Sequence, residues 1–441
     1  MEIKSRLLKT GFSINLQKNF KIEYPRAVWE SISKETKKTI AENIIYLKTS
    51  PYSLFLEEEI HYNFSVPYMR RLADKGMELD IPRIAEEDNI SSKELIEKFK
   101  KRKIRFKYNY TKKIKNISTE GSSIVSISFG KDSLLSYAIA KELNLNPKLV
   151  LVQDFWDLEA YHKLRLVKKF KKEFKEKISI VYDYIDDIST HKRINKTNSK
   201  GIVATNAMSS YMAILLPFAI YNKSEYIIFG NEQNFNDYFT NKEGFNVYPS
   251  HEQNSNWMLE QSKSLRGFTN NKIRLCSLVE PLYNIAEIKV LFNRYPAIAK
   301  YQMSCSQEIG NKKSRWCYNC PMCAKAFLYL VANNINPKII DFKINFFNKE
   351  YKRLYPLFNK PFRIYEKPKA VRDEQLLAFY LAYRNKKNGY LIKKFKENFL
   401  AEAKEREDEL YNRFFKIHTA VSIPKKIKTQ VKSIYKEELN K

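Results

Sequence analysis

The sequence predicts an α/β fold, a doubly wound parallel sheet preceded by an N-terminal α+β region and followed by a C-terminal helical region. Between about residues 121 and 340, short β-rich runs alternate with stretches of helical periodicity, which is typical of parallel strands joined by crossover helices. The chain has 441 residues and a hydrophobic content of 44%, enough for a core of two or three domains. We therefore divide it into regions 1–120, 121–340 and 341–441.

The two outer regions are predicted mainly from helical periodicity. In region 1–120 we expect a helix over 27–47, an extended segment over 53–64 and a charged helix over 91–103. In region 341–441 we expect helices over 373–384, 390–415 and 427–438. The C-terminal helices would either cover the core or make an oligomer contact, and the sequence leaves the oligomeric state open.

In region 121–340 the alternation gives four strands and three helices. We expect the strands at residues 123–128, 149–154, 178–184 and 226–230, and the helices at 134–143, 158–174 and 207–220. Ligands of such sheets bind beyond the carboxyl ends of the strands. The polar residues at three of these ends are therefore expected to converge on one face: the loop Ser128 to Ser133, Gln153 with Asp154, and Gly230 with Asn231 and Glu232.

The loop from Ser128 to Ser133 is the most informative stretch, because it connects a strand to the start of a helix. Backbone N–H groups and the helix dipole favour an anion at such a junction. It is not a Walker A loop: Asp132 follows Lys131 where Ser or Thr is required, and Val125 stands where the first glycine belongs. We therefore predict a phosphate-binding loop of another kind.

Four of the five cysteines have the spacing of metal ligands. Three of them are separated by two residues each, and the fourth lies upstream: Cys305, Cys317, Cys320 and Cys323. Four thiolates complete a tetrahedral zinc site, and a closed site of this kind stabilises a loop and performs no chemistry. We predict structural zinc in the loop 305–323 and expect Cys276 to be a small buried side chain.

The formal net charge of +30 suggests a polyanionic partner. The best candidate segment runs from Phe99 to Lys115, where lysines and arginines interleave with aromatic residues as RNA contact requires. Similar lysine runs recur along the chain, however, and a solvated helix face is the ordinary explanation for them. Contact with RNA through residues 99–115 is thus one of two open interpretations.

The chain is expected to be cytoplasmic and to make no membrane contact. The longest apolar run, residues 211–221, is shorter than the eighteen residues that span a bilayer and is interrupted by Pro217. The chain opens Met1-Glu2-Ile3-Lys4 without the apolar core of a signal peptide. A reducing compartment follows, which agrees with cysteines that bind metal.

Ser128-Phe129-Gly130-Lys131-Asp132-Ser133 resembles the SGGxDS signature of the PP-loop ATP pyrophosphatases, with Phe129 in place of the first glycine. The cysteine spacing is similar to that of the branch that includes 7-cyano-7-deazaguanine synthase. Three further stretches resemble the ATP-dependent epimerase of UDP-muramoyl-L-alanyl-L-glutamate: Gly230 to Glu232, Ser277 to Leu282 and Arg315 to Cys323. These resemblances cover roughly the middle half of the chain, and the tail has no counterpart in them.

The resemblance implies a HUP-like core that binds ATP and Mg²⁺, splits ATP to AMP and pyrophosphate, and joins AMP to a small-molecule carboxylate. Ammonia attack would then give a nitrile, and proton removal and return would give an epimer. In this scheme Lys131 neutralises the leaving group, Asp132 stands near Mg²⁺, and Glu232, Asp237 or His251 is a candidate base. The groups expected to hold the nucleotide are Ser128, Phe129, Gly130, Lys131, Asp132, Ser133, Asp154 and Asn231.

Two other classes of function fit the same residues. In the first, the loop activates a base on tRNA while the segment from Phe99 to Lys115 holds the backbone. In the second, the protein binds a nucleotide without catalysis, which Phe129 favours. A glycine at that position would let the backbone approach a phosphate or take a positive φ.

Overall fold

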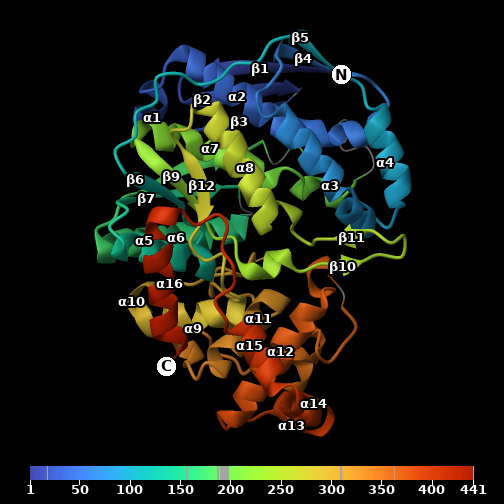
Figure 1. Cartoon of the computed structure of the whole chain (residues 1–441), viewed down its shortest axis with the longest axis vertical. Helices are drawn as coiled ribbons and strands as arrows, with labels where there is room; N and C mark the ends of the chain where they lie inside the picture. Colours follow the sequence, from blue (N-terminus) through green and yellow to red (C-terminus); the bar gives the residue numbers. More distant parts are fainter. Residues whose placement is uncertain are drawn as a thin grey trace.

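The computed structural model describes residues 1–16, 18–154, 157–185, 188, 198–307, 310–361 and 363–440. Ten of its strands form one sheet (Figure 1). They are β1 (Glu2–Leu8), β2 (Gly11–Leu16), β3 (Lys18–Glu23), β4 (Ile60–Ser65), β5 (Ile104–Tyr108), β6 (Ser122–Ser126), β7 (Pro147–Gln153), β8 (Ile178–Asp183), β9 (Ser224–Phe229) and β12 (Arg274–Ser277). Their order across the sheet is β12-β9-β6-β7-β8-β3-β2-β1-β4-β5. The predicted α/β fold is confirmed, as a largely parallel mixed sheet.

The half of the sheet from β12 to β8 is parallel throughout. From β6 the chain adds β7 and then β8 on one side, and afterwards β9 and β12 on the other. The direction of winding thus reverses between β6 and β9. In a doubly wound sheet this reversal opens a crevice at the carboxyl ends of the strands, where ligands bind.

Alternate residues of the parallel strands point into two separate cores. Val125, Leu149 and Leu151 belong to one core, and Ile124, Val150 and Val152 to the other. The first core contains side chains of α5 (Lys131–Glu142), α6 (Asp157–Phe174) and α9 (Asn284–Arg294). The second contains those of α2 (Lys34–Thr49), α3 (Arg70–Asp88), α7 (Ala207–Tyr221) and α8 (Ser255–Phe268). Both faces of the sheet are therefore covered, as near-continuous apolar strands require.

Within the described part of the chain, one helix is long and apolar enough to cross a membrane, judged by length and composition alone. It comprises Gly201–Tyr221, and 72% of its apolar window is buried inside the molecule. Its side chains in α7 belong to the second core, against the sheet. This burial is that of a core helix.

The N-terminal region adds its strands to the same sheet. β3 pairs with β8 antiparallel through Ile22 and Glu23, β1 to β3 form an antiparallel meander, and β1, β4 and β5 are parallel. The helix expected over 27–47 is two helices, α1 (Arg26–Glu30) and α2, because the Ser33 hydroxyl accepts from Thr36 N and starts α2 afresh. Only the end of the segment 53–64 is a strand, β4, and the charged helix is α4 (Ser92–Lys101).

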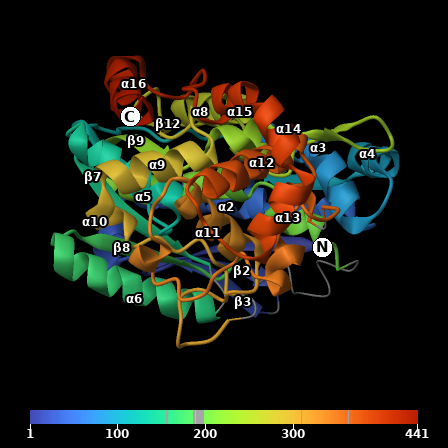
Figure 2. The same cartoon turned by 90° about the horizontal axis from the view of Figure 1, so that it is seen from below.

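The C-terminal region packs against the first core, and Figure 2 views it from below. Its helices are α12 (Lys369–Arg384), α13 (Tyr390–Asn398), α14 (Leu400–Glu405), α15 (Glu407–Phe414) and α16 (Lys425–Leu439). The single helix expected over 390–415 is wrong: the backbone leaves the helical conformation at Phe399 and Arg406. Phe399 packs on Phe358, and Arg406 pairs with the buried Asp373 at 3.0 Å. These tertiary contacts outweigh local helix propensity.

Phe129 has the left-handed backbone conformation, which glycine adopts most easily, and it stands where the SGGxDS signature has its first glycine. Its φ is 62°, whereas that of Gly130 is −66°. The Phe129 ring is fully buried and meets Phe170 edge-on at 5.8 Å. The packing of the ring in the core holds a conformation that costs a non-glycine residue roughly 1–2 kcal/mol.

We expect Phe129→Ala to lower the free energy of unfolding by about 3–5 kcal/mol, because it empties a fully buried aromatic site. Phe129→Gly should be no less stable than Phe129→Ala, since glycine takes this φ without strain. Urea denaturation followed by circular dichroism measures both. Tyr221→Ala, at an exposed helix end, is the control and should change stability by about 0.5 kcal/mol at most. A glycine variant clearly weaker than the alanine variant would contradict this account.

Candidate functional site

The loop after β6 is held in shape by its own serines. The Ser133 hydroxyl accepts from Ser128 N at 3.2 Å and donates to Gly130 O at 3.1 Å. Gly130 N points to Ser128 Oγ at 3.4 Å and precedes α5, which begins at Lys131. The loop therefore lies at a helix N-terminus beside the reversal of the sheet, where anions bind well.

A second loop, after β9, presses against the first. A Cβ atom at Gly230 would lie 2.5 Å from Asp132 Cβ, so this contact requires glycine. At Gly130 an added Cβ would meet only ordinary contacts, at 3.5 and 3.6 Å. Two of the three predicted strand ends, those of β6 and β9, thus meet in the structure.

A cluster of charges joins these loops to α9. The Lys131 ammonium bonds to Asp132 and Glu232, and to Glu287 Oε2 at 2.6 Å. Lys131, Glu232 and Glu287 are buried, while Asp132 is partly exposed. We call these four residues the Lys131 cluster.

Burial and charge act against one another in the Lys131 cluster. Burial opposes ionisation of Asp132, but the Lys131 ammonium outweighs it and lowers the pKa of Asp132 to about 2. For Glu232 burial prevails and raises the pKa to about 7. For Glu287 burial and the charge of Asp132 raise the pKa well above its usual range. At neutral pH the cluster therefore keeps a proton on Glu287.

The three carboxyl groups of the cluster could together hold a metal ion. Their oxygen atoms lie within 4.8 Å of one another. Mg²⁺ prefers carboxylate and phosphate oxygens and retains several waters. Asp132, Glu232 and Glu287 therefore fit a divalent cation, with the Lys131 ammonium now bonded to all three.

Glu287 was not among the sequence-based candidates. It lies 156 positions after Lys131, in the first turn of α9, among the buried residues Ile285, Ile288 and Val290. The sequence signal that could have identified it is an acidic residue within the apolar face of a helix, a position where an unpaired carboxylate is rarely buried. The sequence does not show what this residue faces.

Lys163 was also not among the residues predicted from the sequence. Its side chain holds the loop after β6 through backbone carbonyl groups. Its buried ammonium, on α6, donates to Ser128 O and to Met303 O, the latter at 3.0 Å. Met303 N in turn donates to Phe129 O at 2.7 Å. The loop after β6 is thus attached to the chain that leads into Cys305.

Three predicted residues lie outside the Lys131 cluster. Asp154, at the end of β7, accepts a hydrogen bond from the Tyr211 hydroxyl. Asn231 is buried, and its side-chain nitrogen has no hydrogen-bond partner in the described part of the chain. Asp237 accepts from the Tyr283 hydroxyl at 3.2 Å and from Arg413 at 3.1 Å, so it ties its loop to α15.

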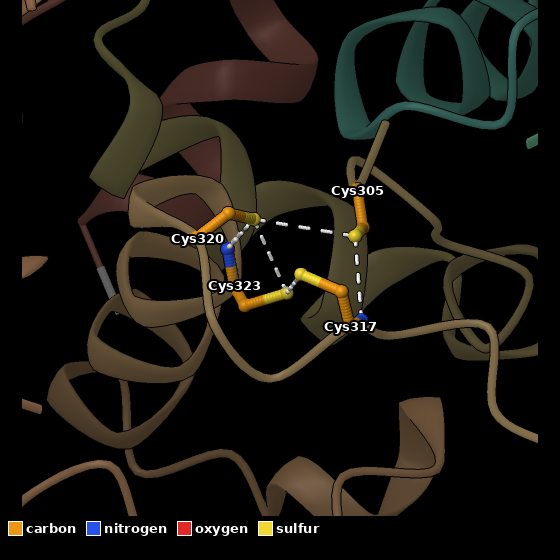
Figure 3. A group of neighbouring side chains, drawn as sticks. All are labelled: Cys305, Cys317, Cys320 and Cys323. Atoms are coloured by element: carbon orange, nitrogen blue, oxygen red, sulfur yellow. Dashed lines mark hydrogen bonds between the residues drawn. The ribbon is translucent and has the colours of Figure 1, made fainter. Parts of the chain in front are cut away.

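The four cysteines point toward one another (Figure 3). The Sγ–Sγ distances are 4.0 Å for Cys305–Cys320, 3.8 Å for Cys317–Cys323 and 3.5 Å for Cys320–Cys323. Zinc–thiolate bonds of about 2.3 Å in a tetrahedron place sulfur atoms about 3.8 Å apart. Backbone N–H groups of Gln307, Cys317, Asn319 and Cys323 approach the sulfur atoms at 3.4 Å. The cluster fits zinc. Residues 308 and 309 of its loop lie outside the described chain.

Cys276 is separate from this cluster. It lies in β12, is 1% exposed, and has a pKa raised by burial. The expectation of a small buried side chain is confirmed.

His251 and Glu252 belong to a different buried network. His251 Nδ1 lies 3.3 Å from Asn254 Nδ2. Glu252 accepts from Met208 N at 2.6 Å and from Ser209 N at 3.3 Å, and so caps α7. Burial and the charge of Asp80 raise the pKa of Glu252 to about 8.

This raised pKa predicts a stability that falls with rising pH. Between about pH 4.5 and 8 the unfolded chain releases the proton of Glu252 while the folded chain retains it, so ionisation favours unfolding. From pH 6 to pH 8 the free energy of unfolding should drop by about 2 kcal/mol more in the wild type than in Glu252→Gln. Urea titrations at both pH values measure the difference. Glu260→Gln is the control, because it leaves Glu252 in place: its free energy of unfolding should fall between pH 6 and pH 8 by the same amount as that of the wild type. A hydrogen bond from Lys263 lowers the pKa of Glu260, so this carboxyl is ionised throughout that range.

The segment from Phe99 to Lys115 includes the edge strand β5. Arg102 pairs with Asp74 at 3.1 Å and Arg105 with Glu59 at 2.6 Å. Tyr108 and Tyr110 are 42% and 49% exposed, with their rings 5.9 Å apart. Part of the positive charge is thus compensated, while two adjacent tyrosines remain open to solvent.

No protein-family model matches this chain, and no curated protein matches it. Fold and site together define a Rossmann-like α/β protein with a mixed sheet and a four-cysteine cluster able to bind a metal ion.

Proposed function

We propose that this protein is an ATP-dependent adenylating enzyme of the PP-loop type, acting on a small-molecule carboxylate in the cytoplasm. One observation carries the proposal: the Lys131 cluster stands beside a helix-opening loop, at the reversal of the doubly wound sheet. That is where phosphate, cation and acceptor would have to meet.

The reaction joins a carboxylate oxygen to the α-phosphorus of ATP while the bond to the β-phosphate oxygen breaks, so that pyrophosphate leaves. Backbone N–H groups from Phe129 to Ser133 would bind the pyrophosphate, and Lys131 would neutralise its developing charge. Asp132, Glu232 and Glu287 would hold Mg²⁺, which supplies further neutralisation of phosphate charge. Glu287 would keep its proton and contribute its carbonyl oxygen.

The four cysteines have a supporting role in this proposal. Zinc would be held by Cys305, Cys317, Cys320 and Cys323 and would fix the chain around α11 (Pro321–Ala332). Met303, two residues before Cys305, contacts the loop backbone. The cluster would thus stabilise the wall of the site and take no part in the reaction.

Carboxylate-dependent exchange of labelled pyrophosphate into ATP tests the proposal. The panel contains 7-carboxy-7-deazaguanine, glutamate-terminated nucleotide-sugar peptides and simple amino acids, each with Mg²⁺. We expect exchange with one class only, and AMP as the product of turnover. ADP and phosphate as the sole products would contradict adenylation.

A second candidate, a tRNA-modifying enzyme, is favoured by the exposed pair Tyr108 and Tyr110. Lys107 Nζ lies 5.4 Å from the ring centre of Tyr108, and Lys112 Nζ lies 5.7 Å from that of Tyr110. Bases stack on such rings while lysines contact the backbone. Filter binding of tRNA over a range of salt concentrations tests it, since phosphate contacts make affinity fall steeply with salt. Absence of binding at low salt would exclude this candidate.

A further inference from the structure

A cavity of about 310 Å³ opens beside the Lys131 cluster. From the loop after β6 it reaches only Lys131 and Asp132. Its opposite wall consists of α11 and of C-terminal residues such as Tyr365 and Val371. The cavity therefore lies between the loop after β6 and the part of the chain that follows the cysteine cluster.

Two polar atoms in the wall of this cavity are buried without a hydrogen-bond partner in the described residues. They are the side-chain oxygen of Gln302 and the hydroxyl of Tyr365. Gln302 is only 1% exposed. A buried polar atom left unsatisfied costs roughly 1–3 kcal/mol, so each such atom points to a missing partner.

The chemistry of these two atoms determines which hydrogen-bonding groups the missing partner must carry. The Gln302 oxygen only accepts, so it requires an N–H or O–H donor. Burial raises the pKa of Tyr365 to about 12, so its hydroxyl is protonated at neutral pH and can donate or accept. The remaining wall is mostly apolar, with Ile288, Ala326 and Pro356 among its residues.

Lys325 supplies positive charge at the same cavity. It lies on α11 and acts on Glu232 through space. Among the described residues it forms no ion pair with a carboxylate. Its neighbour in the wall is the ring of Tyr329, 5.8 Å from Nζ. An anionic group entering the cavity would therefore find an ammonium that is not already neutralised.

We propose that this cavity is the acceptor pocket and that it selects a compact carboxylic acid carrying an N–H or O–H donor, with Gln302 and Tyr365 as the residues that recognise the donor. This inference rests on the proposed adenylation. A volume of about 310 Å³ is at the lower end of small-molecule sites, which span about 300–1,000 Å³. Such a pocket encloses a heterocyclic or amino acid, whereas most of a nucleotide-sugar peptide would have to lie outside it. The C-terminal region thereby determines which acid is adenylated.

Direct binding by isothermal titration calorimetry tests the inference on the full-length, zinc-loaded protein. The probes are 7-carboxy-7-deazaguanine, indole-3-carboxylate, its N-methyl derivative, glutamate and a UDP-muramoyl dipeptide. An α,β-methylene analogue of ATP with Mg²⁺ is titrated separately. We expect a compact acid with an N–H group to bind, and the N-methylated or large probes to bind at least about tenfold more weakly, the value of one lost hydrogen bond.

Variants connect this binding to the two polar atoms. Gln302→Leu and Tyr365→Phe should each weaken binding of the acid about five- to tenfold and leave the dissociation constant of the ATP analogue within about twofold. Tyr351→Phe removes a hydroxyl from the same region outside the cavity and serves as the matched control. Tyr365→Phe also covers the case in which Gln302→Leu fails to fold.

The outcomes separate this inference from the proposed function. Binding of no compact acid, equal binding of the large probe, or unchanged affinity in Tyr365→Phe would overturn the pocket assignment, even if the ATP analogue binds. Binding of an acid without binding of the analogue would support the pocket and overturn adenylation.

Discussion

Replacing Asp132 with asparagine is expected to lower pyrophosphate exchange by about 10²–10³-fold. Asp132 is the carboxylate of the cluster that is fully ionised at neutral pH, because Lys131 outweighs burial and lowers its pKa to about 2. The substitution keeps the shape and removes the charge. Loss of one preorganised electrostatic group in a catalytic site typically costs this much.

Glu287→Gln is the informative comparison. Burial keeps a proton on Glu287 at neutral pH, and glutamine resembles that protonated form. We therefore expect Glu287→Gln to lose at least about tenfold less activity than Asp132→Asn. Initial rates of exchange at saturating ATP and Mg²⁺ measure both.

Glu176→Gln is the control for this series, since Glu176 pairs with Lys141 outside the cluster. It should retain exchange within about a factor of ten of the wild type. If Glu287→Gln were as inactive as Asp132→Asn, Glu287 would have to act as a charged group, and the protonation assigned to the cluster would be wrong. Thermal melts of each variant exclude unfolding as the cause.

Removal of zinc is expected to have the largest effect on the fold. Four thiolates draw together the chain at Cys305, the turn at Cys317 and the N-terminus of α11. Structural zinc binds with about 10–16 kcal/mol in small domains, and this free energy adds to folding. Cys320→Ser should release the metal and lower the melting temperature by at least about 10 °C.

Zinc per chain, measured by inductively coupled plasma mass spectrometry, should be one in the wild type and close to zero in Cys320→Ser. Cys276→Ala is the matched control, because Cys276 is a buried thiol outside the cluster. It should keep its zinc. A wild-type protein that is folded and active after dialysis against a strong chelator, with no metal left, would remove the zinc assignment.

The parallel core was predictable because its information is local. Each strand from β6 to β9 is a short β-rich run followed by a turn, so periodicity located them to within two residues: β6 was expected at 123–128 and lies at Ser122–Ser126. The loop after β6 and the cysteine spacing are likewise contained in a few consecutive residues.

The rest depends on contacts between distant residues. That β3 would pair with β8 could not be deduced from either strand, because the pairing joins Glu23 to Tyr182. Glu287 enters the site only when α9 packs beside the loop. The breaks at Phe399 and Arg406 arise from side chains that reach Phe358 and Asp373. Hydrophobic periodicity is a local property of the sequence and does not reveal such contacts.

The sheet has an open border at β5, the last strand in its order. Unpaired N–H and C=O groups along such a border can recruit the same border of another molecule and start aggregation. β5 carries Arg105 and Lys107, so two copies approaching side by side would bring like charges together. We expect these cations to limit self-association at high protein concentration, an effect that requires no nucleic acid.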